Sequence, residues 1–522
     1  MSPLPWLLVI LAACCVESYK VLVVFPFPGK SHAILGDGVV RLLLKAGHEV
    51  TYITPILNKK PPPNLHQIDV TDNYQMFVNN KDMINIAQFF KVKQQMTIKS
   101  LFDFMFQMHK MTFNNPNVQR LCKDPKQHFD VIIGEWMFND LYSLFSTIFQ
   151  APFIWVSTVD PHWMALQLID QSTNPAYTAD IQSNSIPPFT FYERVQQLVY
   201  QIVGYGLKKF YAAKYEQEII ELVKPLIQYR GHEVPDFEEL RYNSSLMLGN
   251  SHVSMGSAMA LPQNYKPIAG YHIETDIKPL PEDLQKLMDN AKHGVIYFSM
   301  GSNLKSRDFP DEVKMGLVRL FGELKQTVLW KFEEVLPGAP SNLKFLQWAP
   351  QASILAHPNC ILFITHGGLL STTETVHFGK PIIGIPVFAD QFINVERAVK
   401  NGFATKVDLD FNMVEDLRVA ITEMINNPSF TKRVKELSFI YHHRPVSPGA
   451  ELVHWVEHVV KTQGAPHLRS PALDVPFYQK TYLDLAAVLL ATIYVVFATL
   501  KFICKRFLCS RGKISSKNKK NN

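Results

Sequence analysis

Cysteine is scarce in the part of this chain that can form folded domains. Two of its six cysteines fall in an apolar run at the N-terminus, and two lie in or beyond an apolar run at the C-terminus. Only Cys122 and Cys360 remain between them, and Cys360 begins a run with the character of a buried strand. The sequence therefore predicts no disulfide framework, and Cys360 is interpreted as a small core hydrophobe.

The chain also lacks an excess of basic residues outside its C-terminal tail. Its net charge is +6, but residues 505–522 contain seven Lys or Arg and no acid, which leaves about −1 for the rest. A nearly neutral body offers no basic face, so no nucleic-acid partner is predicted. With 522 residues, 47% hydrophobic and 19% charged, the composition is typical of a globular protein with two ordinary domains.

No glycine-rich GxGxxG fingerprint follows the first predicted strand. Residues 19–25 and 48–54 are apolar and β-branched, and an amphipathic segment that begins near Ser31 separates them. This order predicts a Rossmann-like half that is not built for a dinucleotide. It places His32 at the carboxyl end of the first strand, where the ligand crevice of such a sheet opens. The alternative for a single histidine is a surface or capping residue.

The most informative pattern lies within residues 348–391. Cys360–Thr365 is an apolar run of strand length that ends at His366-Gly367-Gly368. Residues 369–378 are predicted to form a helix and 382–386 a second buried strand. Glycine N–H groups at a helix N-terminus favour an anion, so this unit predicts a site for a group such as a diphosphate.

Residues 348–391 closely resemble the signature of the membrane-bound UDP-glycosyltransferases, which conjugate small lipophilic molecules. The match begins at the aromatic-x-Pro-Gln of 348–351 and includes the His-Gly-Gly turn, Glu374 and Asp390-Gln391. The resemblance covers nearly the whole chain. It implies an α/β fold of the GT-B type, with two Rossmann-like domains facing across a crevice and a C-terminal transmembrane helix. It also implies an enzyme for which the UDP-sugar is a co-substrate and which needs no cofactor or metal.

The resemblance assigns a role to each residue of the signature. Glycine turns would bind the diphosphate through backbone N–H groups, and the remaining residues would hold the nucleoside and the sugar. The implied UDP-sugar residues are Gly301, Ser302, His366, Gly367 and Gly368 for the diphosphate, Trp348 and Gln351 for uracil, Glu374 for the ribose, and Asp390 and Gln391 for the sugar. The alternatives are a phosphate site for another nucleotide and, at Gly301-Ser302, an ordinary turn.

Catalysis would then fall to His32 as general base, with a carboxylate behind it to fix the tautomer of the imidazole. The family usually places Asp there, whereas this sequence has Glu135. Attack opposite to UDP would invert the anomeric centre. Relatives often carry a donor-binding Arg within the segment equivalent to 255–262, and this chain has none. Together with Leu369-Leu370 after the glycines, this favours UDP-glucose over UDP-glucuronate as the donor.

Two rival functions stay open at this point. One is a non-catalytic nucleotide-sugar-binding partner subunit, which Glu135 favours. The other is a lipid or sterol glucosyltransferase instead of a detoxifying enzyme. Residues 80–110 are rich in Phe and Met, a pattern that is more often core but in this family would also line a lipophilic acceptor pocket. A homo-oligomer is compatible with either function.

Motifs near the chain ends bear on topology. The apolar N-terminal run is interpreted as a signal peptide cleaved near Ser18, the alternative being an uncleaved anchor. The span at 483–503 is followed by the basic tail, which predicts a single-pass protein with a lumenal body. Lys519-Lys520 resembles the retrieval signal of endoplasmic-reticulum proteins, or is an ordinary basic tail. Asn243 is a glycosylation sequon. His454, Glu457 and His458 match a zinc-protease pattern, but no third ligand is placed for it, so no metal is predicted.

These observations predict the following segments: signal peptide 1–18, acceptor-binding domain 19–265, linker 266–285, UDP-sugar-binding domain 286–440, C-terminal helices 441–482, transmembrane helix 483–503 and cytosolic tail 504–522.

Overall fold

The computed structural model describes residues 17–76, 89–90, 98–181, 183–302, 304–334 and 336–518, with side chains up to Phe507 at the C-terminal end. Nearly all of the predicted signal peptide and the Lys519-Lys520 pair lie outside these residues. The chain forms two compact units, Met1–Arg469 and Ser470–Asn522. We call the first unit the body.

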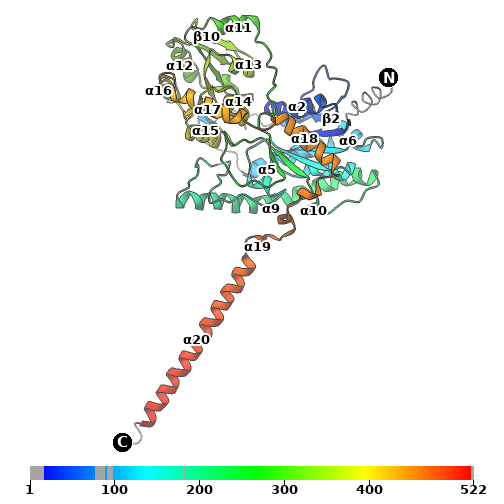
Figure 1. The fold of residues 1–522 in the computed structure, drawn as a ribbon, viewed down its shortest axis with the longest axis vertical. Helices are drawn as coiled ribbons and strands as arrows, with labels where there is room; N and C mark the ends of the chain where they lie inside the picture. Colours follow the sequence, from blue (N-terminus) through cyan, green and yellow to red (C-terminus); the bar gives the residue numbers. More distant parts are fainter. Residues whose placement is uncertain are drawn as a thin grey trace, which may run out of the picture. The chain divides into compact units, whose positions relative to one another are not determined.

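The first half of the body is a parallel sheet with helices on both sides (Figure 1), and its inner strands, such as β1, β4 and β5, are buried on both faces. The strand order is β3-β2-β1-β4-β5-β6-β7. The chain adds β2 and β3 on one side of β1 and then adds β4 on the other side, so the strand order reverses between β1 and β4. The strands are β1 (Lys20–Val24), β2 (Glu49–Thr54), β3 (Leu65–Asp69), β4 (Val131–Trp136), β5 (Phe153–Ser157), β6 (Leu246–Gly249) and β7 (Tyr265–Pro267). In open α/β sheets, ligands bind at such a reversal, outside the carboxyl ends of the strands.

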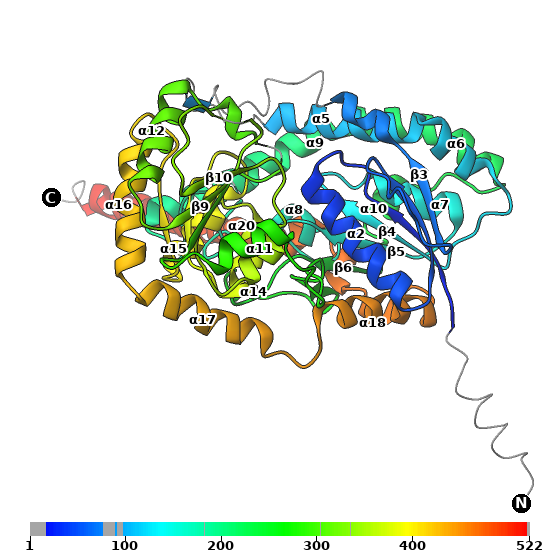
Figure 2. The same ribbon diagram turned by 90° about the horizontal axis from the view of Figure 1, so that it is seen from above.

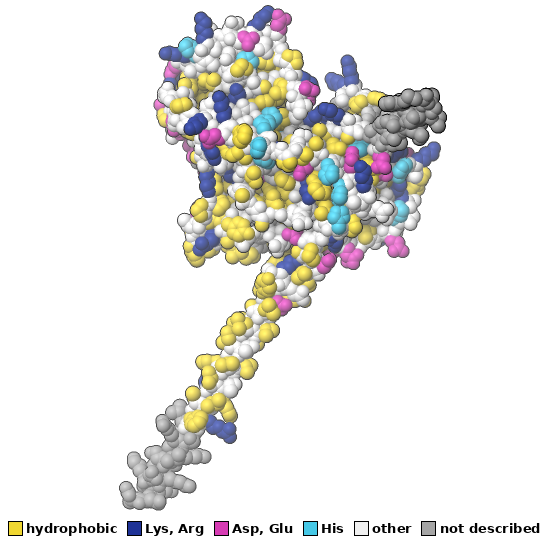
Figure 3. Space-filling model, viewed as in Figure 1, with side chains coloured by type: hydrophobic (Ala, Val, Ile, Leu, Met, Phe, Trp, Pro, Cys, Tyr) yellow, Lys and Arg dark blue, Asp and Glu magenta, His cyan; other side chains and the backbone are white. Residues whose placement is uncertain are grey.

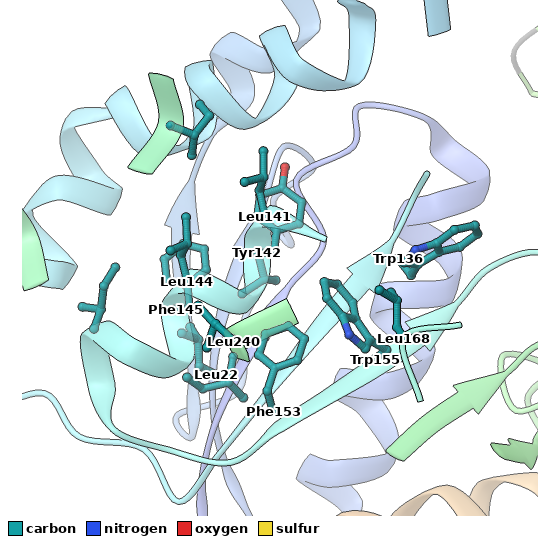
Figure 4. Close-up of a cluster of buried hydrophobic side chains, with 14 of the residues drawn as sticks. Leu22, Trp136, Leu141, Tyr142, Leu144, Phe145, Phe153, Trp155, Leu168 and Leu240 are labelled. Atoms are coloured by element: carbon teal, nitrogen blue, oxygen red, sulfur yellow. The ribbon is translucent and has the colours of Figure 1, made fainter. Parts of the chain in front are cut away.

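Alternation along β1 divides the core of this half into two layers. Val21 and Val23 belong to the cluster formed with α2 (Lys30–Lys45) and α18 (Pro448–Lys461). Leu22 and Val24 face the opposite way, into an aromatic cluster that helices α5 (Ile98–Asn114) and α9 (Phe191–Tyr229) cover. Figure 4 shows Leu22 in that cluster among Phe145, Phe153 and Trp155. The period-2 alternation of a strand explains why both faces are apolar.

The second half repeats the same topology. Its parallel sheet has the order β10-β9-β8-β11-β12-β13, which reverses between β8 and β11. The strands are β8 (Val295–Ser299), β9 (Thr327–Lys331), β10 (Leu343–Leu346), β11 (Cys360–Thr365), β12 (Ile382–Gly384) and β13 (Ala404–Lys406). Figure 2 shows the two halves as separate lobes, with α12 (Asp311–Gly322) and α16 (Met413–Asn426) on the second. The expectation of two Rossmann-like domains is therefore confirmed.

Side chains and a returning helix hold the two halves together. Arg397 of α15 (Gln391–Lys400) donates to Asp160, which follows β5, at 2.6 Å, and both side chains are buried. The guanidinium of Arg41 on α2 donates to the backbone carbonyls of Tyr271 and His272, which lie in the segment that joins the two halves. α18 comes after the second sheet in the sequence but packs on α2 of the first.

The structure adds detail to two predicted boundaries without testing the division into domains, which stays a prediction. The predicted linker begins at residue 266, whereas β7 continues to Pro267, and α11 (Glu282–Asp289) begins inside the linker. The predicted segment 441–482 also contains the end of the body at Arg469.

The second unit consists mainly of one long helix, α20 (Leu483–Asn518). Within it, the 25 residues Leu483–Phe507 contain an 18-residue window with a mean hydropathy of 2.2. At ~1.5 Å per residue the whole stretch exceeds the ~30 Å hydrocarbon core of a bilayer. By length and composition the segment can therefore cross a membrane, and it contains the span predicted at 483–503.

Candidate functional site

A cavity of about 710 Å³ opens where the carboxyl ends of the two sheets face each other, and residues of both halves line it. This volume lies within the range of small-molecule sites. The lining includes most of the residues that the sequence predicted for the site. These are His32, Gly301, Ser302, Trp348, Gln351, His366, Gly368, Glu374, Asp390 and Gln391.

His32 and Glu135 stand at the reversal of the first sheet. His32 lies in the first turn of α2, directly after β1, and Glu135 lies at the carboxyl end of the neighbouring strand β4. The carboxylate of Glu135 contacts Nδ1 of His32, and its side chain is 1% exposed. With Nδ1 engaged in this way, Nε2 is left for a substrate hydroxyl, which is the arrangement of a general base with an orienting carboxylate.

Two glycine turns stand at the reversal of the second sheet and enclose His366. A Cβ at Gly301 would lie 2.5 Å from the His366 ring, and one at Gly368 would lie 2.7 Å from its Nε2. Gly301 and Gly367 also have φ of +81° and +80°, which disfavours other residues. Burial and the nearby Lys331 lower the pKa of His366 to about 4, so its imidazole is neutral at pH 7. Gly367 holds the turn without lining the cavity.

Lys331 is a functional candidate that the sequence analysis missed. It ends β9, lines the cavity, and donates to the Gly301 carbonyl at 2.9 Å and to Glu333 at 3.1 Å. A buried ammonium group beside both glycine turns is suited to a diphosphate. β9 ends in VLWK, which contains no motif. Recognition of β9 as a strand of this sheet would have placed Lys331 at the carboxyl edge.

The side of the cavity that is predicted to hold the nucleoside contains a chain of hydrogen bonds. The Tyr297 hydroxyl donates to Gln351 Oε1 at 3.2 Å, and the Gln351 amide donates to Ser371 and to Glu374. Trp348 stands beside them, 57% exposed, with the ammonium group of Lys30 from the first half 4.5 Å from its ring centre. An exposed indole face and a carboxylate are suited to a base and its ribose. Tyr297 and Ser371 carry no sequence signal.

The turn before α15, which is predicted to hold the sugar, lines another side of the cavity. Asp390 accepts from the Asn394 amide at 2.9 Å and follows Ala389, which has φ of +55°. Burial raises the pKa of Asp390, and Asn394 opposes this rise. The Gln391 side-chain oxygen accepts from the backbone N–H groups of Val387 and Phe388, so it also braces the turn.

Apolar side chains form another side of the cavity. Leu101, Phe104 and Met105 of α5 line it, and the acceptor role of residues 80–110 stays a prediction. Residues 80–88 and 91–97 of that stretch lie outside the described residues. Asn243 lies away from the cavity, on the surface after α10 (Phe237–Arg241), where its side chain is exposed. Among the described residues no group of three or more His, Cys, Asp or Glu could hold a metal ion.

We expect UDP to bind more weakly as the pH falls below about 7. Burial raises the pKa of Glu374 to about 7, and the Gln351 hydrogen bond opposes this rise. Ribose hydroxyls in the predicted site would donate to the ionised carboxylate and so lower its pKa again. Binding at lower pH therefore releases a proton, and affinity is lost by up to ~10-fold per pH unit as the pH falls. Calorimetry with UDP between about pH 5 and 8 measures this.

The matched variant for this experiment is Glu374→Gln, which keeps the shape and removes the titration. It should lose the part of the pH dependence that comes from the protein, while titration of the UDP phosphate persists in both proteins. An identical slope for both proteins would remove Glu374 from the ribose site.

Two parallel sheets of this order, facing each other across a cleft with glycine turns on one side, define the GT-B class of glycosyltransferases. Solved structures of that class share the fold. The glycotransferase of kitacinnamycin has a TM-score of 0.53 and 16% identity, over 86% of this chain and 99% of that one. A UDP-glucosyltransferase from Polygonum tinctorium has a TM-score of 0.55 and 15% identity, over 85% and 99%.

The chain belongs to the UDP-glycosyltransferase family, because the family model "UDP-glucoronosyl and UDP-glucosyl transferase" matches residues 20–520. UDP-glycosyltransferase UGT5 of Dactylopius coccus is 33% identical, over 94% of this chain and 93% of the relative. UDP-glucuronosyltransferase 2B15 of Rattus norvegicus is 28% identical, over 88% and 87%. The protein is thus an enzyme of this family, which transfers a sugar from a UDP-sugar.

Proposed function

We propose that this enzyme transfers glucose from UDP-glucose to a hydroxyl of a small lipophilic acceptor, with inversion, and that His32 is the base. The contact between His32 and Glu135 at the cavity wall carries this proposal. The acceptor hydroxyl gives its proton to Nε2 of His32 while its oxygen bonds to the anomeric carbon. The bond from that carbon to the β-phosphate oxygen breaks, and UDP leaves with the electron pair.

Each half of the body has its own task in this mechanism. The carboxylate of Glu135 stabilises the imidazolium that forms on His32. The glycine turns, His366 and Lys331 act as fixed donors to the charge that develops on the diphosphate. The leaving group is stabilised by the protein alone, so we propose no metal and no further cofactor.

Two observations favour glucose over glucuronate. The segment 255–262 has no arginine to meet a sugar carboxylate. Arg397, which lies with Met255 and Gly256 around a small recess, is already paired with Asp160. A glucuronate carboxylate at Arg397 would compete with the existing buried ion pair. UDP-glucuronate is the alternative donor, and the donor assay includes it.

The donor assay compares UDP-glucose and UDP-glucuronate with mixed phenols in microsomes that contain the full chain, with product mass as the readout. We expect a glycoside whose mass shows an added hexose, and little or no glucuronide. Microsomes without the chain are the control. A glucuronide as the main product would overturn the donor assignment. If the protein binds a UDP-sugar but forms no glycoside, the result would instead favour a non-catalytic subunit.

For location, we propose a single-pass protein of the endoplasmic reticulum with the body in the lumen. The apolar stretch Leu483–Phe507 is the anchor, and the basic residues after it remain cytosolic. Exposed Asn243 is then available for a glycan. A glycosidase-sensitive mass shift that Asn243→Gln abolishes would support the lumenal body.

A further inference from the structure

Helix α9 has three polar residues and one glycine turned inward along its first half. Gln197, Gln201, Gly204 and Lys208 follow one another at steps of four, three and four, so they lie on one face. Gln197 is buried; it donates to Ser183 at 2.7 Å and accepts from the Asp180 N–H at 2.8 Å. This face is the one that packs on the rest of the body.

The other contacts of the inward face are equally specific. The Gln201 amide donates to the Thr173 carbonyl at 3.1 Å. A Cβ at Gly204 would lie 2.9 Å from the Trp163 ring. The Lys208 ammonium group pairs with buried Asp140 at 3.3 Å. A rotation of the helix that brought its apolar side to the core would break these contacts.

The outward face is apolar. Seven exposed side chains occupy an arc of about 140°, at 100° per residue. They are Phe191, Tyr192, Val195, Leu198, Val199, Ile202 and Val203. Phe191 is 75% exposed and Ile202 is 61% exposed. Hydrophobic side chains gather along the edge of the body that α9 forms (Figures 1 and 3). A water-facing helix has the opposite arrangement, so water is not the environment of this face.

Lipid fits this face better than a second copy of the chain does. An arc of this width exceeds the narrow seam of a coiled coil. Aromatic residues at its start and cations beside it, Arg194 and Lys209, match helices that lie in a membrane interface. Thirteen residues separate the end of the body at Arg469 from the start of the candidate anchor at Leu483. At ~3.5 Å per residue, these residues can hold the body no further than ~45 Å from a bilayer.

We propose that the apolar face of α9, residues 191–203, inserts into the surface of the bilayer that the C-terminal anchor crosses. This inference rests on the proposed membrane anchoring and not on the proposed reaction. The apolar side chains would lie ~5–10 Å into the boundary between headgroups and acyl chains. Tethering keeps the local lipid concentration high, so even a weak contact persists.

The test uses the full chain in lipid nanodiscs, with Cys504→Ser and Cys509→Ser to remove the cysteines of the C-terminal tail. Bimane is attached at Val199→Cys or, as a matched control, at Val419→Cys. Val419 is a similarly exposed valine on α16. We expect the emission at position 199 to shift to the blue and to lose most of its intensity when the phospholipid is brominated near the headgroup end. Position 419 should show neither change.

Two results would overturn the proposal. Water-like emission at position 199 would mean that the face is exposed to solvent. A blue shift without bromine quenching would mean that protein covers it, as in a dimer. Unaltered thermal melting shows that each variant folds, and resistance to carbonate extraction shows that the anchor is in place. None of these measurements requires turnover, so a failed assignment of the reaction leaves the test intact.

Discussion

Replacing His32 by alanine is expected to lower turnover by ~10²–10⁴-fold, the range for removal of a general base. The acceptor hydroxyl then has no group to take its proton as the glycosidic bond forms. UDP should bind nearly as tightly as before, because the donor-site residues come from the second half of the body while His32 lies on the first. Initial rates with saturating UDP-glucose and a phenol measure the loss, and calorimetry with UDP measures binding.

His128→Ala is a matched control for this experiment, since His128 is an exposed histidine of the same half whose ring hydrogen-bonds to a backbone carbonyl. It should leave both quantities unchanged. Turnover of His32→Ala close to that of the parent protein would make His32 a bystander. Loss of UDP binding in this variant would show that the two halves are not independent.

Replacing Glu135 by glutamine should reduce turnover nearly as far, up to ~10⁴-fold by analogy with the carboxylate of a hydrolase triad. The shape of the side chain is kept, but the anion that stabilises imidazolium at His32 is gone. Glu135→Asp keeps the charge and shortens the reach by one methylene, so it should cost less. Both variants are measured with the same rate assay as His32→Ala.

The pH dependence of the rate separates this positioning role from a structural one. Without the anion, His32 accepts a proton less readily, so the acidic limb of the pH–rate profile of Glu135→Gln should move to lower pH. Glu49→Gln, a partly exposed acid on β2, serves as the control and should not move it. An unmoved profile together with tolerated glutamine would make Glu135 a structural residue at a strand end.

Much of the fold could be predicted from local patterns. The run CILFIT forms β11 and residues 369–378 form α14, as the apolar run and its glycine boundaries predicted. The strands predicted at 19–25 and 48–54 were also found, as β1 and β2. β9 and β10 were not. β9 is short and buried on both faces, so it has no period to detect, and β10 has only four residues.

The site could be predicted where its residues are contiguous in a motif. It could not be predicted where segments that are distant in the sequence meet. His366, Gly367 and Gly368 follow one another, and so do Asp390 and Gln391. Lys331 has no motif, and it becomes a candidate only because β9 ends at the cavity. The hydrogen bonds by which Gln391 stabilises its own turn could not be predicted either, because the sequence does not show which side chains bond to the backbone.

The sequence by itself determined the two Rossmann-like halves, the glycine turns and the apolar C-terminal stretch, because each depends on neighbours a few residues apart. Tertiary structure decided what depends on distant segments. His32 and Glu135 are 103 residues apart and meet because β1 and β4 pair at the reversal of the sheet. The same holds for α9. Its sequence shows an aromatic helix, but only the contacts of Gln197, Gln201 and Lys208 turn the apolar face outward, since buried polar groups must find partners and these lie on one side.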